Sequence, residues 1–250
     1  MSNELQIKDQ SVPGFLTQFW GPTGFETVTN DCISIPFLRL AQMNTPQVQP
    51  GTDKLPGLEA GMYFNPNTGR IYGKEPKFVI LGFYRSWNEW NGEPPDAKFV
   101  KQITNEEYQR DYEKNTFRND KGKIVDRDGN RYIDTRNFFL LSMDHPEDGV
   151  LMYPMSSTAI PASKKWLAKA TAIRITDSEG DLQQAPIWAR IWQLRSSFVQ
   201  SPKGNYFQVA DVIDCGWIPD NSVSAIKNAF EEVLEYDKTR IVATDRVVEE

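Results

Sequence analysis

The sequence contains very few of the side chains that most catalytic and metal sites use. Its 250 residues include one histidine, His145, and two cysteines, Cys32 and Cys215. Two cysteines so far apart predict neither a disulfide framework nor a thiolate metal site, and they fit a reducing compartment. A Ser-His-Asp triad or a multi-histidine metal site would have to use His145, which stands in the loop-like run MDHPEDG.

Motifs for membrane insertion, nucleotide binding and acid–base catalysis are also absent. No apolar run approaches the ~20 residues of a membrane helix. The first residues, MSNELQIKDQSVPGF, lack the basic and apolar regions of a signal peptide. Neither phosphate-binding glycine loop occurs, and no pair of carboxylates stands out as an acid and a base. These absences predict a cytoplasmic binding protein with no membrane partner, no catalytic residue, no metal and no cofactor.

One short segment has some features of a calcium loop. Asp126, Asp128 and Asn130 could supply oxygen ligands, but Gly129 comes too early and no glutamate follows at the twelfth position. We therefore predict a plain hairpin turn at Asp128-Gly129.

The acidic net charge of −6 hides an uneven distribution of charge along the chain. Residues 150–210 carry seven basic and three acidic side chains, whereas residues 211–250 carry four basic and ten acidic ones. Basic charge therefore gathers in one segment and acidic charge at the C-terminus. A solvated helix face produces similar runs of charge, so the asymmetry alone identifies no partner.

The pattern of apolar residues predicts an α+β protein, mostly antiparallel β. About seven strands and two or three helices do not alternate in βαβ order, which favours an OB-like barrel with inserted hairpins, one internal helix and a C-terminal helix. We expect an irregular N-terminal arm at 1–30, a single barrel domain at 31–236 with an insertion at 93–136, and a charged acidic tail at 237–250. The run KFVILGFYRSW (77–87), apolar on both faces, predicts a central strand.

Local signals predict several further elements. MYFNPNTGRIYG is typical of a β-hairpin. NEEYQRDYEKNTF (105–117) indicates a helix, and the run SSTAIP supplies capping hydroxyls and a first-turn proline ahead of another. A final helix is predicted to start near Asp220 or Ser222.

Trp188, Arg190 and Trp192 alternate in the stretch APIWARIWQLRSSF. Successive side chains of a strand point to opposite faces, so these three would share one face, while the intervening Ile-Ala-Ile face is typical of core. Two indoles with a guanidinium between them suit a single-stranded nucleic acid, whose bases stack on aromatics and whose phosphates pair with arginine. A strand buried on both sides, with the arginine stem packed between indoles, explains the same pattern.

Basic and aromatic residues elsewhere complete the predicted nucleic-acid site. Lys165 and Lys169 lie four apart on a predicted helix and share its face. Trp87 and Trp90 in FYRSWNEW form either a second stacking platform or a packed aromatic cluster. The predicted nucleic-acid-binding residues are Trp188, Arg190, Trp192, Arg195, Lys164, Lys165, Lys169, Tyr84, Arg85, Trp87 and Trp90.

Three blocks of the sequence carry a recognisable combination of motifs: PFLRLAQ to FYRSWNEW, MSSTAIPASKKW, and IWARIWQL to SPKGNYFQVADVIDCGWI. Together they resemble a family of tailed-bacteriophage early proteins over most of residues 33–219. Neither 1–30 nor 93–136 has a counterpart in that family. The matching positions are Gly61, Phe64, Asn65, Thr68, Gly69, Tyr72, Trp90, Ser156, Ser157, Thr158, Ser163, Trp166, Gly204, Tyr206, Gly216 and Trp217.

The resemblance implies a phage single-stranded DNA-binding protein with an OB-type fold, acting in the host cytoplasm during replication and recombination. It also implies an acidic C-terminal tail that occupies the basic groove until DNA displaces it, and then recruits replication proteins such as a polymerase or helicase. The alternative is a structural or interaction protein of a phage, either a virion component or a host-factor inhibitor, whose aromatics are core. An enzyme of nucleic-acid metabolism is the third hypothesis.

Overall fold

The computed structural model describes residues 35–93, 96–176, 178–202 and 204–239. The chain divides into two units, 1–33 and 34–250, and every described residue belongs to the second. The predicted arm at 1–30 lies outside the described residues, as does the predicted tail from residue 240 onward.

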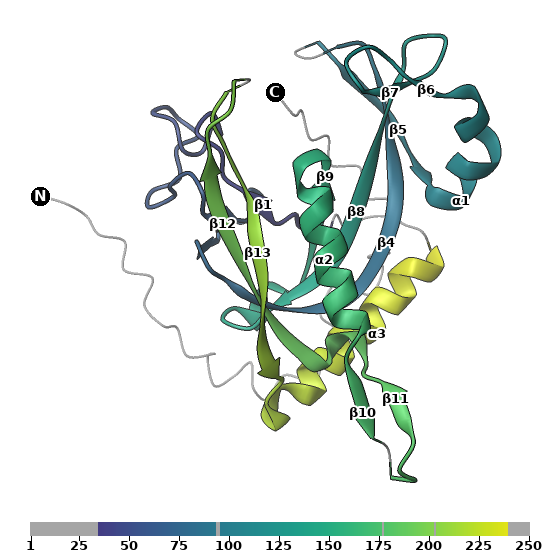
Figure 1. The fold of residues 1–250 in the computed structure, drawn as a ribbon. Coiled ribbons are helices and arrows are strands. Elements are labelled where there is room, and N and C mark those ends of the chain that lie inside the picture. The colour runs from purple at the N-terminus through teal and green to yellow at the C-terminus, as the bar shows by residue number, and fades with distance from the viewer. Residues whose placement is uncertain (1–34, 94–95, 177, 203, 240–250) are drawn as a thin grey trace, which may run out of the picture. The chain divides into compact units, whose positions relative to one another are not determined.

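Eight antiparallel strands form the main sheet, which curls into a half-barrel (Figure 1). The order along its main path is β13-β12-β4-β8-β7-β6, with β5 paired to β4 and β9 paired to β8. Because β12 returns to the other edge of β4, the strands β12-β4-β8-β9 follow the 4-1-2-3 order of a Greek key. The predicted α+β class with mostly antiparallel strands is confirmed. The strands are β4 (Lys77–Asn91), β5 (Lys98–Thr104), β6 (Phe117–Arg118), β7 (Ile124–Val125), β8 (Arg131–Ser142), β9 (Val150–Ser156), β12 (Arg190–Val199) and β13 (Tyr206–Trp217).

Strand β4 is central to this sheet. β8 pairs with it along most of its length, while its opposite edge pairs first with β12 and then, from Ser86 onward, with β5. Near its start, Phe78 and Ile80 join the core on one face and Val79 and Leu81 the core on the other. All four are fully buried. The prediction of a central strand is confirmed, because a continuous apolar run can be buried only where both faces are covered.

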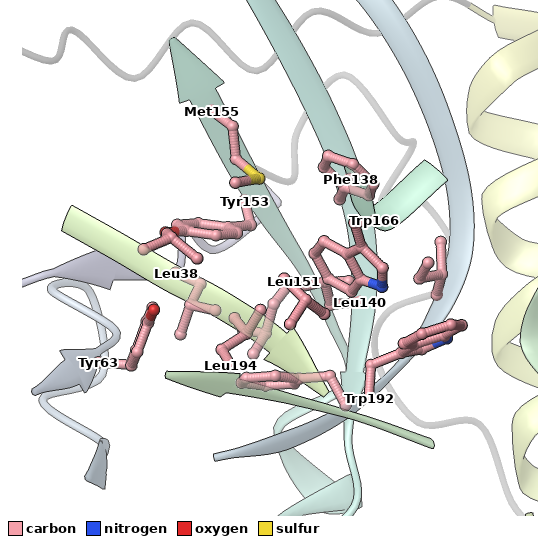
Figure 2. Close-up of a cluster of buried hydrophobic side chains, with 14 of the residues drawn as sticks. Leu38, Tyr63, Phe138, Leu140, Leu151, Tyr153, Met155, Trp166, Trp192 and Leu194 are labelled. Carbon is pink, nitrogen blue, oxygen red and sulfur yellow. The ribbon is translucent and has the colours of Figure 1, made fainter. Parts of the chain in front are cut away.

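Helices cover the two faces of the sheet. α2 (Ile160–Thr171) lies inside the curl and α3 (Val223–Thr239) lies on the outer face (Figure 1). Trp166 of α2 is fully buried and stacks on Phe138 of β8, with ring centroids 4.5 Å apart (Figure 2). On the outer face, a Cβ atom added at Gly82 of β4 would come within 2.8 Å of Val233 of α3. Each helix therefore packs directly against the sheet.

The start of α2 differs in one respect from the prediction. Pro161 lies in the first turn as expected, but the N-cap is Ala159 and it makes no side-chain cap hydrogen bond. The predicted cap from the serine and threonine hydroxyls is wrong, because Ser157 and Thr158 lie in a 3-10 turn, Ser157–Ala159, and Ala159 takes the N-cap position. The C-terminal helix begins at Val223, after a turn at Asp220–Ser222, close to the predicted start.

The insertion at 93–136 extends the far ends of β4 and β8. It contains β5, a helical run, and the short strands β6 and β7. The helix predicted at 105–117 is confirmed over residues 105–115, as three consecutive segments: α1 (Asn105–Glu107), the π-helical turn η2 (Tyr108–Tyr112) and the 3-10 turn η3 (Glu113–Asn115). Phe117 lies in β6 instead.

Two smaller sheets accompany the main one. The predicted hairpin MYFNPNTGRIYG is confirmed: β2 (Tyr63–Phe64) and β3 (Ile71–Gly73) pair with each other, and β1 (Arg39–Leu40) pairs with β2. The other is a ribbon that the sequence did not predict, formed by β10 (Arg174–Thr176) and β11 (Leu182–Gln184). All six of its strand residues are exposed.

Candidate nucleic-acid interface

Trp188 does not share a strand face with Arg190 and Trp192, so this part of the prediction is wrong. A 3-10 turn at Ile187–Ala189 precedes β12, which begins only at Arg190. The turn is closed by a hydrogen bond from the Ala189 N–H to the Pro186 carbonyl. It directs the half-buried Trp188 toward α3, where its ring centroid lies 6.4 Å from that of Phe230.

Trp192 is fully buried, so it offers no surface on which a base could stack. Its indole lies inside the curl of the sheet, 6.4 Å from that of Trp166 in an edge-to-face arrangement (Figure 2). The alternation of the sequence identified a strand, but α2 covers the face that looked free. Of the two explanations for the pattern, the structure supports a strand buried on both sides at this residue.

The aromatic residues of β4 are also packing residues. Trp87 is buried and stacks on Tyr108 with ring centroids 3.8 Å apart, and the buried Trp90 meets Phe99 edge to face. The half-buried Tyr84 packs on the outer face of the sheet near Phe139 and Met152. Trp87 therefore belongs to an aromatic cluster, and neither it nor Trp90 forms a stacking platform.

Arg190 does lie beside an accessible indole, but that indole is Trp217. The two residues are cross-strand partners on β12 and β13, and the guanidinium carbon is 4.4 Å from the ring centroid. Arg190 Nε and Nη2 also donate to the Asp214 carboxylate, at 3.0 and 2.7 Å. Trp217 is 51% exposed. The ion pair holds the guanidinium over one face of the indole and leaves much of the ring open to solvent.

The exposed side of α2 continues this surface. Lys164 and Lys165 are exposed, and within the described part of the chain neither forms a hydrogen bond or a close ion pair with a carboxylate. Lys169 Nζ lies 3.5 Å from the Asp211 carboxylate of β13, and the positive charges of Lys169 and Lys165 both help to lower the pKa of that carboxyl. We call Lys164, Lys165, Lys169, Arg190 and Trp217 the α2–β13 surface.

Two carboxylates of β13 lie within the α2–β13 surface. The pKa of Asp211 is lowered mainly by the backbone N–H of Val212, and then by Lys169 and Lys165. Burial alone would raise the pKa of Asp214, but hydrogen bonds from Arg190 and the Gly216 N–H hold it below its usual value. Both are therefore ionised at neutral pH and partly offset the four basic side chains around them.

Lys169 has a second role at the outer edge of the sheet, which β13 forms. Its ammonium group donates to the Val212 carbonyl at 2.6 Å. The Val212 N–H donates to the Asp211 carboxylate at 2.8 Å. Both outward backbone groups of Val212 are therefore satisfied by side chains, and Lys169 is held in place against β13.

Two other predicted arginines are engaged with carboxylates. Arg195 Nε lies 2.8 Å from Glu75 on the protein surface. Arg85 makes two hydrogen bonds to Asp134, at 2.8 and 3.0 Å, and its guanidinium carbon is 5.1 Å from the Trp87 ring centroid. Neither arginine belongs to the α2–β13 surface, so the predicted residues do not form one continuous site.

Trp217 is an exposed aromatic residue of the α2–β13 surface that the sequence did not single out as a binding residue. In the sequence, Trp217 is only one of the positions that match the phage family, near the end of a predicted strand. Its role as the partner of Arg190 depends on the register between β12 and β13, which contains a bulge between Arg190 and Trp192. No local pattern in the sequence specifies that register.

The turn at Asp126 is a hairpin turn, as predicted. Its carboxylate accepts hydrogen bonds from the backbone N–H groups of Asp128 and Asn130 and from the Tyr132 hydroxyl. No group of three or more metal-ligating side chains occurs among the residues that the structure describes. Burial would raise the pKa of Asp126, but these hydrogen bonds together lower it.

We expect the Asp126→Asn substitution to lower the melting temperature at neutral pH by about 2–4 °C, for roughly 1 kcal/mol of hydrogen bonding. Because the folded-state pKa of Asp126 is depressed, its contribution is fully present above the unfolded pKa near ~3.9 and is lost as the pH falls through the folded value. Melting curves should therefore converge in acid. Asp128→Asn, in the same turn with an exposed side chain, is the control. A difference that persists in acid would contradict this account.

The described residues thus define an α+β protein with a curled antiparallel sheet and a partly exposed basic surface. A family model described as Pam3 phage gp34-like protein matches residues 7–239, and the chain belongs to that family. The match indicates a phage protein. Searches of curated proteins and of solved structures gave no match. Within the described residues, no helix is both long and apolar enough to cross a membrane.

Proposed function

We propose that this chain is a phage single-stranded DNA-binding protein built on an OB-type fold, and that it acts by binding rather than by catalysis. The observation that carries the proposal is the α2–β13 surface. It combines an indole that is half open to solvent, a guanidinium fixed over that indole, and two exposed lysines, Lys164 and Lys165, that form no ion pair among the described residues. Bases stack on such rings, and the cations meet the phosphates between them.

The strand order supports an OB-type fold. An OB fold is a five-stranded, partly open Greek-key barrel that binds oligonucleotides. Here β4, β8, β9, β12 and β13 pair in Greek-key order, and α2 connects β9 to β12. The sheet curls, and no other described strand pairs with the outer edge of β13, which agrees with a partly open barrel. Fold alone does not establish function, so the proposal depends on the surface chemistry.

Replacing Trp217 by alanine is expected to weaken binding to oligo-dT by about tenfold or more, because base–aromatic stacking contributes roughly 1–3 kcal/mol per base. Phe117→Ala is the matched control, since Phe117 is 53% exposed and lies on β6. Fluorescence anisotropy of a labelled oligonucleotide measures both affinities. If the Trp217 variant binds normally, or the Phe117 variant loses affinity instead, the α2–β13 surface is not the contact.

The lysines of α2 provide a second test of the same surface. Each phosphate contact on a single strand contributes about −0.7 to the slope of log K against log salt. Replacing Lys164 and Lys165 together by glutamine should therefore make the slope shallower by about 1.4. An unchanged slope would leave these lysines as ordinary surface charge.

The proposed biological setting is DNA replication and recombination in the host cytoplasm. The acidic C-terminal segment would compete with DNA for the basic surface and recruit a polymerase or helicase. Most of that segment lies outside the described residues, so its support is the charge pattern of the sequence alone.

One observation favours the alternative of a structural or interaction protein. The β10–β11 ribbon exposes Ile175 and Leu182, the latter with 71% of its surface accessible. Isolated two-stranded ribbons are marginally stable in water, so a partner that packs against this one would stabilise it. Absence of oligo-dT binding even at low salt would favour this alternative.

A further inference from the structure

Two arginines face each other across the sheet just beyond the part of the core that α2 covers. Arg85 of β4 and Arg136 of β8 are direct cross-strand partners. Like charges in such pairs repel each other, because their side chains share one face at close range. One nearby carboxylate, Asp134, lies on the same face.

That carboxylate is already used by Arg85. Arg85 Nε and Nη2 each donate to one of its two oxygens, at 2.8 and 3.0 Å. Arg136 approaches no closer than 4.0 Å, which is an ion pair without a hydrogen bond. The three groups together carry one uncompensated positive charge.

Arg136 lacks hydrogen-bond acceptors as well as a carboxylate of its own that would neutralise its charge. Its side chain is only 13% exposed, and its Nε is buried without a partner. Among the residues that the structure describes, none accepts a hydrogen bond from this guanidinium. Burying a charged group without acceptors is costly, because water no longer solvates it. The described residues therefore leave the Arg136 guanidinium without the acceptors that a purely structural arginine would have.

We propose that Arg85 and Arg136 form a binding site for a phosphate group. A guanidinium presents a planar fork of donors that matches the oxygens of phosphate, and two forks with one carboxylate leave a net positive charge for the anion. A ligand can reach the arginine pair from solvent, because the side chain of Arg85 is about one third exposed and that of Asp134 about one quarter. The rings of Phe138 and Trp87 lie on either side of the arginine pair along the two strands, and they limit the access of water that would compete with the phosphate for the guanidinium groups.

The site does not depend on the DNA-binding proposal. The same chemistry is offered by inorganic phosphate, by a mononucleotide and by the phosphodiester backbone of a nucleic acid. These sources differ in size and charge, so they can be separated experimentally.

The test compares melting temperatures in chloride and in sodium phosphate at equal ionic strength and pH. At about ten times the dissociation constant, phosphate should raise the melting temperature of the unmodified protein by roughly 3–6 °C. Arg136→Met should abolish that rise, and should melt no lower than the unmodified protein in chloride, because a costly buried charge is gone. Arg195→Met, which removes an exposed arginine paired with Glu75, is the control and should keep the rise.

Three outcomes would overturn the site: no response of the unmodified protein to any of the three phosphate sources, a full response in Arg136→Met, or loss of the response in Arg195→Met. If Arg136→Met does not fold, Arg85→Lys keeps the charge but loses the fork, and should weaken the response. Repeating the measurement with a mononucleotide and with oligo-dT identifies the source. A response to inorganic phosphate in an unmodified protein that binds no oligo-dT would support this site while rejecting the DNA-binding proposal.

Discussion

The Trp192→Ala variant is expected to lose about 3–5 kcal/mol of unfolding free energy, the usual cost of truncating a buried tryptophan. The reason is its position between the strands and α2, where it is fully buried and in edge-to-face contact with Trp166. The cavity left behind cannot collapse easily, because Trp166 is itself stacked on Phe138. Urea denaturation followed by circular dichroism measures the loss.

The matched control for this prediction is Trp217→Ala. It removes an indole of the same size from the same sheet, but from a half-exposed position. Its stability should change by about 1 kcal/mol or less, the value of an exposed cation–π contact with Arg190. The two variants thus separate stability from binding. A stable Trp192→Ala variant with weakened DNA binding would contradict both assignments.

The Gly61→Ala variant is expected to lose about 2–4 kcal/mol of unfolding free energy, which is the sum of backbone strain and overpacking. Gly61 has a φ of +88°, a left-handed conformation that side chains disfavour. A Cβ atom there would lie 2.6 Å from a ring carbon of Phe207. That ring is hard to move, because Phe198 packs against it on the neighbouring strand.

Gly73→Ala provides a control that isolates the backbone term. Gly73 has nearly the same φ, +84°, but nothing lies within 4 Å of an added Cβ atom. The Gly73→Ala variant should lose about 1 kcal/mol of unfolding free energy, as expected for backbone strain alone. Urea denaturation measures both variants. Equal losses of unfolding free energy would show that the Phe207 ring moves aside without destabilising the protein.

Much of the fold could be predicted from the sequence because local patterns determine it. The doubly apolar run of β4, the turn residues of the β2–β3 hairpin and the first-turn proline of α2 each have a local physical cause. The β10–β11 ribbon was missed because its strands are three residues long, too short for a periodic pattern to emerge.

The candidate site was harder to predict, because accessibility is a tertiary property. Trp192 and Trp217 are equally apolar in the sequence, and only the placement of α2 buries the first and leaves the second exposed. Trp188 was misplaced for a local reason, since the turn after Pro186 ends the alternation before the strand begins. The two arginines at positions 85 and 136 lie far apart in the chain, and only strand register brings them together.

The contacts of Lys169 and Asp211 with Val212 also affect how copies of this protein can associate. An open strand edge is a template onto which another chain can add a strand, and from which aggregates grow. At Val212 both backbone groups are already occupied, so a second chain approaching along β13 would have to displace a lysine and an aspartate before it could pair there. At this position in the middle of β13, the occupied backbone therefore opposes the addition of a strand from another copy.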